Sequence, residues 1–402
     1  MRSRSRWLLV VCALSACAEP AVPAARDAGR GPEVAAPLEP AAPAAPSEPA
    51  AAAVAPREVR AGEVVEVPAG ALRAGSLPGT PGRRPSVEAD LAEVALGAFS
   101  IDRLPYPNDP AQAPRLVASR REAAALCEAQ GRRLCTELEW ERACKGDGAA
   151  SFPTGEAMDL EACAADAAAC GSPLGVLDLG VRAPEWTASD AEARLARLER
   201  TVVARGASEA DPPHAHRCAA RAAVAPEGGR PLAFRCCGGE APAVAYPDVG
   251  LRRLFRDLTL EVARAREILA AVPALARFAP SFAPYDVEDA RRALARGGAT
   301  EASTQWELAP GPFAWSPSPG EEVWVIAGRV ADGALLAALY PMPDGTFLHA
   351  ASFVLEGEDA PFAVLRTRSS RSELLWTTCW GCVGEGGAIR FDEESRIVIA
   401  QQ

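Results

Sequence analysis

Cysteine content constrains this chain more than any other feature. The sequence has twelve cysteines, and ten of them lie beyond residue 126. Whether those ten form disulfides depends on the compartment, because thiols outside the cytosol tend to be oxidised. Ten is an even number and is therefore compatible with complete pairing. The destination of the chain thus decides how its cysteines are interpreted.

Residues 1–17 resemble the signal peptide of a bacterial lipoprotein. A basic start is followed by an apolar run from Trp7 to Leu14 and then by Leu-Ser-Ala-Cys, which ends at Cys17. The run is far too short to span a bilayer of ~30 Å. The resemblance implies that Cys17 carries lipid after cleavage, whereas an ordinary signal peptide would be cut near Ala18. Both alternatives export the protein, and the first anchors it to the cell envelope, in the periplasm or at the outer membrane.

Composition separates a tether from a folded remainder and excludes one class of partner. Residues 18–57 are mainly Ala, Pro and Glu, and such a segment buries too little apolar surface to offset the entropy of ordering. We expect a disordered tether there. The formal net charge of −11 argues against nucleic acid as a partner, since binding phosphates requires clustered cations.

The folded remainder exceeds the size of a typical single domain, so we expect two domains, over residues 58–240 and 246–402. In the first domain, two capping boxes predict helices near 119–130 and 137–144. Each box is a hydroxyl residue followed three positions later by glutamate.

The second domain is expected to be a helical hairpin packed on an antiparallel sheet. Apolar residues between Leu251 and Val262 fall on one helical face, and a second helix is predicted from Asp286 to Leu294. After Trp306, β-rich runs separated by Asp-Gly turns indicate antiparallel strands. This part resembles no family known to us.

Cys379 and Cys382 have the spacing of a redox motif in the sequence CWGC. The surrounding pattern lacks the βαβ arrangement of thioredoxins. A structural disulfide at a strand end is favoured over a catalytic dithiol.

Several segments of the first domain occur in the order found in one known family. They are GEVVEVPAGALRAGS (62–76), AAALCEAQGRRLCTELEWERACKG (123–146), LGVLDLGVRAPEWT (174–187), ARGAS (204–208) and RCAAR (217–221). Together they resemble the formylglycine-generating enzymes, also called sulfatase-modifying factors. The resemblance covers residues 64–237 and implies an irregular α+β fold related to C-type lectins and stapled by disulfides.

The resemblance also implies two disulfides and a catalytic centre. The disulfides implied by position join Cys127 to Cys236 and Cys144 to Cys218. In the family, two cysteines shortly before the RCAAR run hold copper, and these positions fall here on Ser208 and Pro213. Neither residue supplies a thiolate, the soft ligand that Cu(I) selects. No catalytic residue is therefore expected, as in a pseudoenzyme.

A second metal site of the family is also altered. Arg182 stands where the family has an asparagine, in a segment that helps to bind structural calcium. A guanidinium has no acceptor atom and its charge opposes a cation. We expect no cofactor, and copper or calcium only if the family sites are rebuilt.

Four further cysteines have no counterpart in the family. Cys163 and Cys170 lie close in sequence and pair most simply with one another. Cys135 and Cys237 then remain, either as a structural disulfide or as a relocated copper dithiol.

One loop carries candidate metal ligands. Asp211, His214 and His216 lie within DPPHAHRC, either as ligands or as ordinary titrating loop residues. The second reading is favoured because no further ligand is assignable. The resemblance places this loop over the family's peptide groove, where a ligand would be met.

Two functions remain for the protein. It is either a binding module that presents its surface to a peptide, a glycan or an exported protein, or an oxidoreductase that converts a target cysteine to formylglycine. The missing thiols favour the binding module, since function is argued from the site and not from the fold.

Overall fold

Five β-sheets organise the computed structural model of the chain, and no sheet is shared between residues 64–238 and residues 255–401 among the residues described. The structure describes residues 59–192, 195, 201–357, 361–367, 373–392, 394 and 396–401. Residues 58–402 belong to one compact unit. We call residues 64–238 the N-terminal half and residues 255–401 the C-terminal half. The expected signal peptide, lipidation at Cys17 and tether lie outside the described residues.

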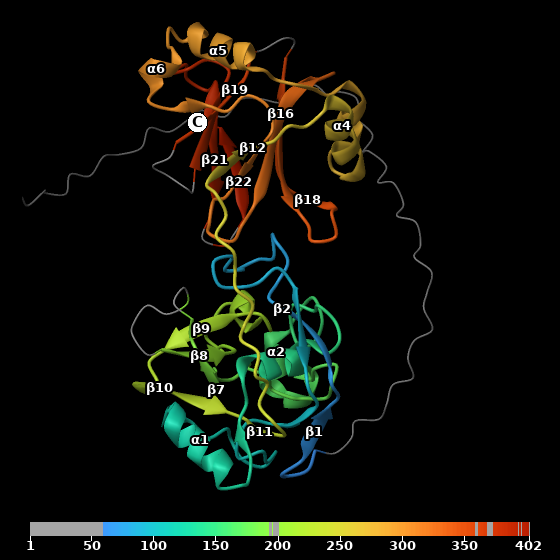
Figure 1. The fold of residues 1–402 in the computed structure, drawn as a ribbon, viewed down its shortest axis with the longest axis vertical. Coiled ribbons are helices and arrows are strands. Elements are labelled where there is room, and N and C mark those ends of the chain that lie inside the picture. The colour runs from blue at the N-terminus through green and yellow to red at the C-terminus, as the bar shows by residue number, and fades with distance from the viewer. Residues whose placement is uncertain are drawn as a thin grey trace, which may run out of the picture. The chain divides into compact units, whose positions relative to one another are not determined.

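The N-terminal half contains three small sheets (Figure 1). The first has the order β1 (Val64–Val67), β4 (Phe99–Asp102), β11 (Cys236–Gly238) and β6 (Arg133–Leu134). The second has the order β5 (Val117–Ser119), β10 (Glu227–Phe234), β7 (Glu185–Asp190), β8 (Val202–Arg205) and β9 (Arg221–Val224). The third pairs β2 (Gly70–Ala74) with β3 (Ala92–Leu96). Only the contact of β10 with β7 is parallel among the strand pairs described.

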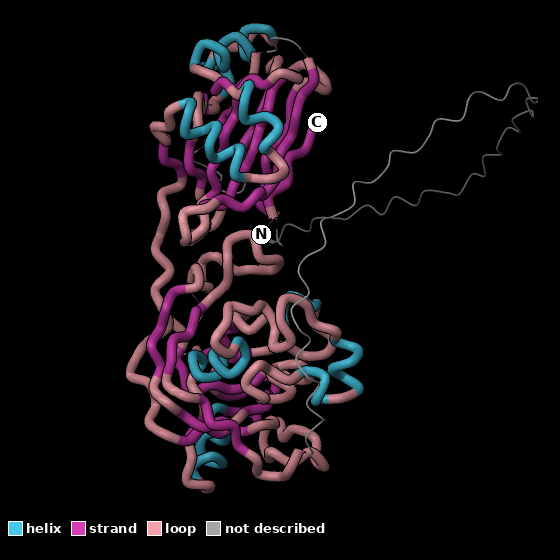
Figure 2. The backbone as a smooth tube through the Cα atoms, turned by 90° about the vertical axis from the view of Figure 1, so that its right-hand side faces the viewer, coloured by secondary structure: helices cyan, strands magenta, loops and turns pink. Residues whose placement is uncertain are grey.

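The two predicted helices of this half begin at their capping residues. In α1 (Arg120–Glu128), the Ser119 hydroxyl accepts from the backbone N–H of Glu122. In α2 (Glu137–Lys145), Thr136 and Glu139 form a reciprocal capping box, which satisfies two backbone donors that the first helical turn leaves free. The shorter helical elements are α3 (Leu160–Ala165), η1 (Ala167–Cys170) and η2 (Pro213–His216). Loops connect most of these elements (Figure 2).

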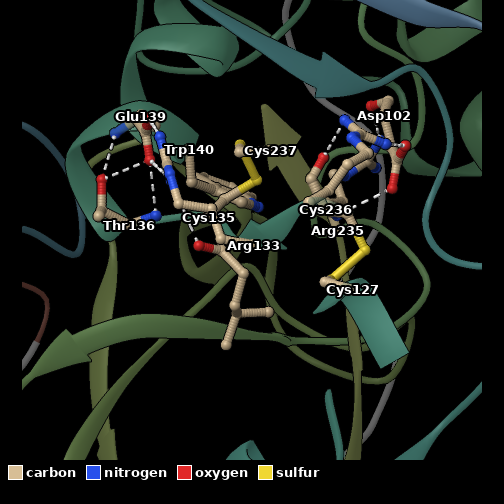
Figure 3. The surroundings of a disulfide bond; sticks show 12 residues. Asp102, Cys127, Arg133, Cys135, Thr136, Glu139, Trp140, Arg235, Cys236 and Cys237 are labelled. Carbon is tan, nitrogen blue, oxygen red and sulfur yellow. Dashed lines mark hydrogen bonds and ion pairs between the residues drawn. A yellow bond between two sulfur atoms is a disulfide. The ribbon is translucent and has the colours of Figure 1, made fainter. Parts of the chain in front are cut away.

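Two adjacent cysteines of β11 staple the N-terminal half from both faces of a sheet (Figure 3). Successive side chains of a strand point to opposite faces. Cys236 therefore reaches Cys127 on α1, and Cys237 reaches Cys135 at the start of the turn into α2. Each disulfide lies in a different apolar cluster, so β11 links two cores.

The remaining disulfides are local or join α2 to the segment before β9. They are Cys144–Cys218, Cys163–Cys170 and Cys379–Cys382. The structure thus contains the two pairs that the family resemblance implies, and it joins Cys135 to Cys237 as a disulfide.

The C-terminal half consists of two antiparallel sheets. The first sheet has the order β12 (Phe255–Asp257), β15 (Phe313–Trp315), β16 (Val323–Val330), β17 (Gly333–Pro341) and β18 (Phe347–Glu356), with β13 (Ala283–Pro284) also paired to β16. The second has the order β14 (Glu307–Leu308), β19 (Ala363–Arg366), β20 (Glu373–Thr377), β21 (Gly386–Phe391) and β22 (Ile397–Gln401). The helical elements are α4 (Val262–Ala271), η3 (Ala276–Ser281), α5 (Val287–Arg296) and α6 (Glu301–Thr304).

Side-chain alternation along the strands produces four layers in this half. Val325 and Leu336 face the core between the two sheets, whereas their neighbours Ile326 and Leu335 face α4. The outer face of the second sheet is covered by α5, which contacts β19. Figure 1 shows α4 near β16 and α5 near β19.

This arrangement corrects the expected helical hairpin. The helices α4 and α5 cover different sheets, so they do not pack as a pair. The helical pattern from Leu251 also fails, because residues Phe255–Asp257 form β12 and the helix begins only at Val262. The β-rich runs 323–330, 334–341, 346–355 and 373–379, predicted as strands, coincide with β16, β17, β18 and β20. The other strands of this half were not predicted, and together they divide between two sheets instead of forming one.

Two glycines bring separate loops of the N-terminal half into backbone contact. A Cβ atom added to Gly180 or Gly206 would lie 2.3 Å from the Cα atom of the other. Both have positive φ, +58° and +77°, which side chains disfavour. The contact is closed by a hydrogen bond from the N–H of Ala207 to the carbonyl oxygen of Gly180.

Replacing Gly206 with alanine should therefore destabilise the protein by about 3 kcal/mol or more, because backbone atoms cannot move aside. Gly97→Ala is the matched control, since an added Cβ there meets nothing within 4 Å. Urea unfolding of the two oxidised variants would measure the difference. Equal free energies of unfolding would show that the glycine contact is not needed.

Candidate functional site

The helix α2 is buried along its whole length, including five charged side chains. A buried charge is tolerated when it is paired and hydrogen-bonded. Glu139 accordingly binds Arg133, and Lys145 lies 2.7 Å from Glu141. Arg142 binds Asp147 and the carbonyl oxygen of Gly146. This helix is therefore held in the interior by ion pairs and hydrogen bonds as well as by apolar contacts.

Glu137 and Glu141 of α2 also bind arginines from the two strands that lie beside the helix. Arg205 on β8 donates to Glu137 and Glu141, each at 2.9 Å. Arg221 on β9 makes a two-point contact with Glu137 at 2.7 and 2.8 Å. Burial opposes ionisation of Glu141, but Lys145 and Arg205 hold the pKa of its carboxyl below the ordinary value.

A second buried pair fixes the segment that precedes β3. Arg217 donates to both carboxylate oxygens of Glu88, at 2.7 and 3.0 Å. Glu88 also accepts from the hydroxyl of Ser76 at 2.8 Å. Burial would raise the pKa of Glu88, but the contact with Arg217 outweighs it and lowers that pKa. Residues 82–88 are thereby held against the loop that precedes Cys218.

That loop is closed by its own hydrogen bonds. Ser208 donates from its hydroxyl to Asp211 at 2.6 Å and from its backbone N–H at 2.8 Å. These bonds lower the pKa of Asp211. Pro213 is the first residue of η2.

The two histidines of the loop have different surroundings. The ring of His214 packs on Gly82, where an added Cβ would lie 2.4 Å from its Cδ2 atom. His216 is buried, and its Nδ1 atom lies 3.2 Å from the carbonyl oxygen of Gly180. Asp211 is engaged by Ser208, and Cys135 and Cys237 are joined to one another. Within the described residues, no group of three His, Cys, Asp or Glu side chains is placed to hold a metal ion.

A groove of about 570 Å³ lies over these arginines and this loop. Its volume is within the range of ligand sites, roughly 300–1,000 Å³. The walls are mostly alanines and other small or apolar residues, and the polar groups include Arg84, Asp211 and His214. Three residues of the C-terminal half, Ser318, Phe391 and Asp392, also line it. The candidate site is thus a cavity whose deep arginines already have partners.

Comparison with known families identifies one domain type in this half. Residues 102–238 match the family model of the sulfatase-modifying factor enzyme 1-like domain. The N-terminal half therefore contains a sulfatase-modifying-factor-like domain. The solved structure of PvdO from Pseudomonas aeruginosa is similar over 43% of this chain and 93% of that chain, with 18% sequence identity and a TM-score of 0.33. No curated protein matches the chain significantly.

The copper centre of this family does not fit the residues present. Ser208 uses its hydroxyl to bind Asp211, and Pro213 offers no side-chain ligand. The cysteines in the described part of the chain are all joined in disulfides, so none of them offers a thiolate to Cu(I). The relocated dithiol of Cys135 and Cys237 would first require reduction of a buried bond.

The segment to which the family resemblance assigns calcium also differs in its contacts. The Nε atom of Arg182 lies 3.7 Å from Asp178, so a cation of the protein itself lies beside this carboxylate. Burial raises the pKa of Asp178 to about 6, although Arg235 and Arg182 act in the opposite direction. A carboxylate that is already faced by a guanidinium of the protein is a poor ligand for Ca²⁺, because the two cations repel each other.

Sequence reasoning missed the acids that position the groove. Glu137 and Glu141 are four residues apart on a helix and so share a face, a spacing that could have indicated a common partner. The arginines of ARGAS and RCAAR were predicted only as part of the family pattern, without acidic partners. Residues 82–88, which form one wall, have no local sequence pattern that indicates a site.

Glu137→Gln should destabilise the domain by about 3 kcal/mol, because it removes the charge that two buried arginines share. Glu267→Gln is the control, since its pair with Arg264 is exposed and should contribute less than ~1 kcal/mol. Chemical denaturation at neutral pH measures both. A cost for Glu137→Gln as small as the control would contradict the assigned role.

Proposed function

We propose that the sulfatase-modifying-factor-like domain is a binding module that holds a peptide segment of an exported protein in the groove. The observation that carries this proposal is the loop over the groove, where Ser208 and Pro213 replace the family's thiols beside an accessible cavity. Binding needs the cavity but not the thiols.

The groove favours a peptide over an anionic ligand. Arg217 and Arg221 are both neutralised by buried acids, so they leave little positive charge for a phosphate or sulfate. The strand β9 lines the groove and is the last strand of its sheet in the described structure. An edge strand offers backbone groups to an added extended peptide, and shallow alanine walls leave room for its side chains.

The test is selection of a random-sequence peptide library on the full chain, followed by affinity measurement with the enriched peptides. Ala222→Arg places a long side chain on the exposed groove wall and should weaken binding by at least about tenfold. Ala125→Arg, on the exposed face of α1, should leave the affinity unchanged.

Other outcomes would replace this proposal. Peptides that bind the Ala222→Arg variant normally would exclude the groove, and binding of glycans but not peptides would change the ligand class. Tight stoichiometric Cu(I) binding, together with conversion of a peptide cysteine to an aldehyde under oxygen, would instead establish the family's oxidoreductase activity.

We also propose that the protein is exported and held at the cell envelope by lipid on Cys17. The support is the signal-like sequence of residues 1–17 and the tether composition of residues 18–57. In the described part of the chain, no helix has the length and apolar character to cross a membrane.

Cys17→Ser should abolish lipid labelling and leave unprocessed precursor, because the modified thiol is removed. Labelling with a radioactive fatty acid in a bacterial host, followed by gel analysis, checks this. Cys12→Ser is the control and should be labelled as the natural chain is. Labelling that persists in the Cys17→Ser variant would exclude this lipid anchor.

A further inference from the structure

The CWGC turn between β20 and β21 differs from the other disulfides in its exposure. The eight cysteines of the other four disulfides are at most 1% exposed, and Cys379 is 4% exposed. Cys382, by contrast, is an exposed residue. Thiol–disulfide exchange requires that an incoming thiolate reach one sulfur. An incoming thiolate can therefore reach the Cys379–Cys382 bond more readily than the other disulfides, and it would attack the sulfur of Cys382.

The two ends of the turn are held differently. On one side, Trp380 donates its N–H to the carbonyl oxygen of Ala293 on α5, and Gly297 lets the Trp380 carbonyl approach closely. On the other side, Gly381 and Gly384 have open space where a side chain would stand. The turn is thus anchored on α5 through Trp380, the residue after Cys379, while Cys382 lies between two glycines that have open space beside them.

Backbone hydrogen bonds would keep the two sulfurs close after the bond opens. The N–H of Cys382 donates to the carbonyl oxygen of Cys379 at 3.1 Å, and that of Thr378 donates to Glu385 at 2.9 Å. The disulfide also closes a sequence separation of only three residues, against 74 to 109 for the three long-range bonds. A disulfide that closes a short loop constrains the unfolded chain least, so this bond contributes least to the stability of the fold.

An exposed apolar side chain follows Cys382. Val383 is fully exposed, and Glu385 of the same turn is paired with Arg296 at 3.3 Å. A partner would therefore be selected by apolar contact and not by charge.

We propose that Cys379–Cys382 is a thiol–disulfide exchange site for a dithiol of an exported protein. A partner thiolate attacks the sulfur of Cys382, the bond between the two cysteines breaks, and Cys379 leaves as a thiolate that takes a proton from water. The second partner thiolate then attacks its own mixed disulfide and releases Cys382. The partner loses two electrons and becomes a disulfide, and the CWGC pair becomes a dithiol.

The test uses the full oxidised chain and a defined protein thiol, reduced thioredoxin with its second active-site cysteine replaced by serine. Mixed disulfides are located by tryptic digestion, which places both cysteines in the peptide of residues 372–390, and by fragmentation of that peptide in the mass spectrometer, which distinguishes attachment at Cys379 from attachment at Cys382. The expected product joins the probe to Cys382, on the order of 100-fold faster than to any other cysteine, because access controls the rate. Attachment to Cys379, to a buried cysteine or to none would overturn the proposal.

Two variants separate the site from its surroundings. Val383→Asp should slow exchange by about tenfold by removing the apolar contact, whereas Val244→Asp, at another exposed valine, should not change the rate. The double variant Cys379→Ser and Cys382→Ser should lose exchange and keep the peptide affinity of the groove. An unchanged rate with Val383→Asp would contradict recognition through the apolar surface, and loss of groove binding in the double variant would contradict an independent site.

Discussion

Compensation of buried charge around α2 is the constraint on which the N-terminal half depends. Glu137 and Glu141 must face the arginines of β8 and β9, because an unpaired charge at this depth would cost several kcal/mol. This requirement fixes the position of the strands relative to the helix, and Arg217 with Glu88 extends it to the groove wall. The groove is thus shaped by residues that have no charge left to offer a ligand.

Sequence patterns predicted those elements that are determined by residues close to one another in the chain. The caps of α1 and α2 and the strands β16, β17, β18 and β20 were predicted, since a side chain within three positions or a β-rich run within one strand determines them. The layer arrangement was not. Apolar residues from Leu251 onward fit a helix as well as an irregular strand, and only the sheet that receives them decides between the two.

The absence of copper ligands at the candidate site could be predicted from the sequence, but the shape of the groove could not. Ser208 and Pro213 could be recognised as unable to hold copper from position alone, because that judgement concerns two side chains. The groove wall at residues 82–88 depends on Glu88 meeting a residue 129 positions later, which no local pattern reveals. Asp211 and His214 do line the cavity, but through separate contacts and not as a ligand set.

The neighbouring cysteines of β11 determine when two disulfides of the N-terminal half can form during synthesis of the chain. A chain that emerges from its amino end exposes Cys127 and Cys135 some hundred residues before either partner. Both thiols must wait unpaired while Cys144, Cys163 and Cys170 appear, and a premature bond among them would block the correct one. Correct pairing of these cysteines is therefore completed only when β11, the last strand of this half, has been made.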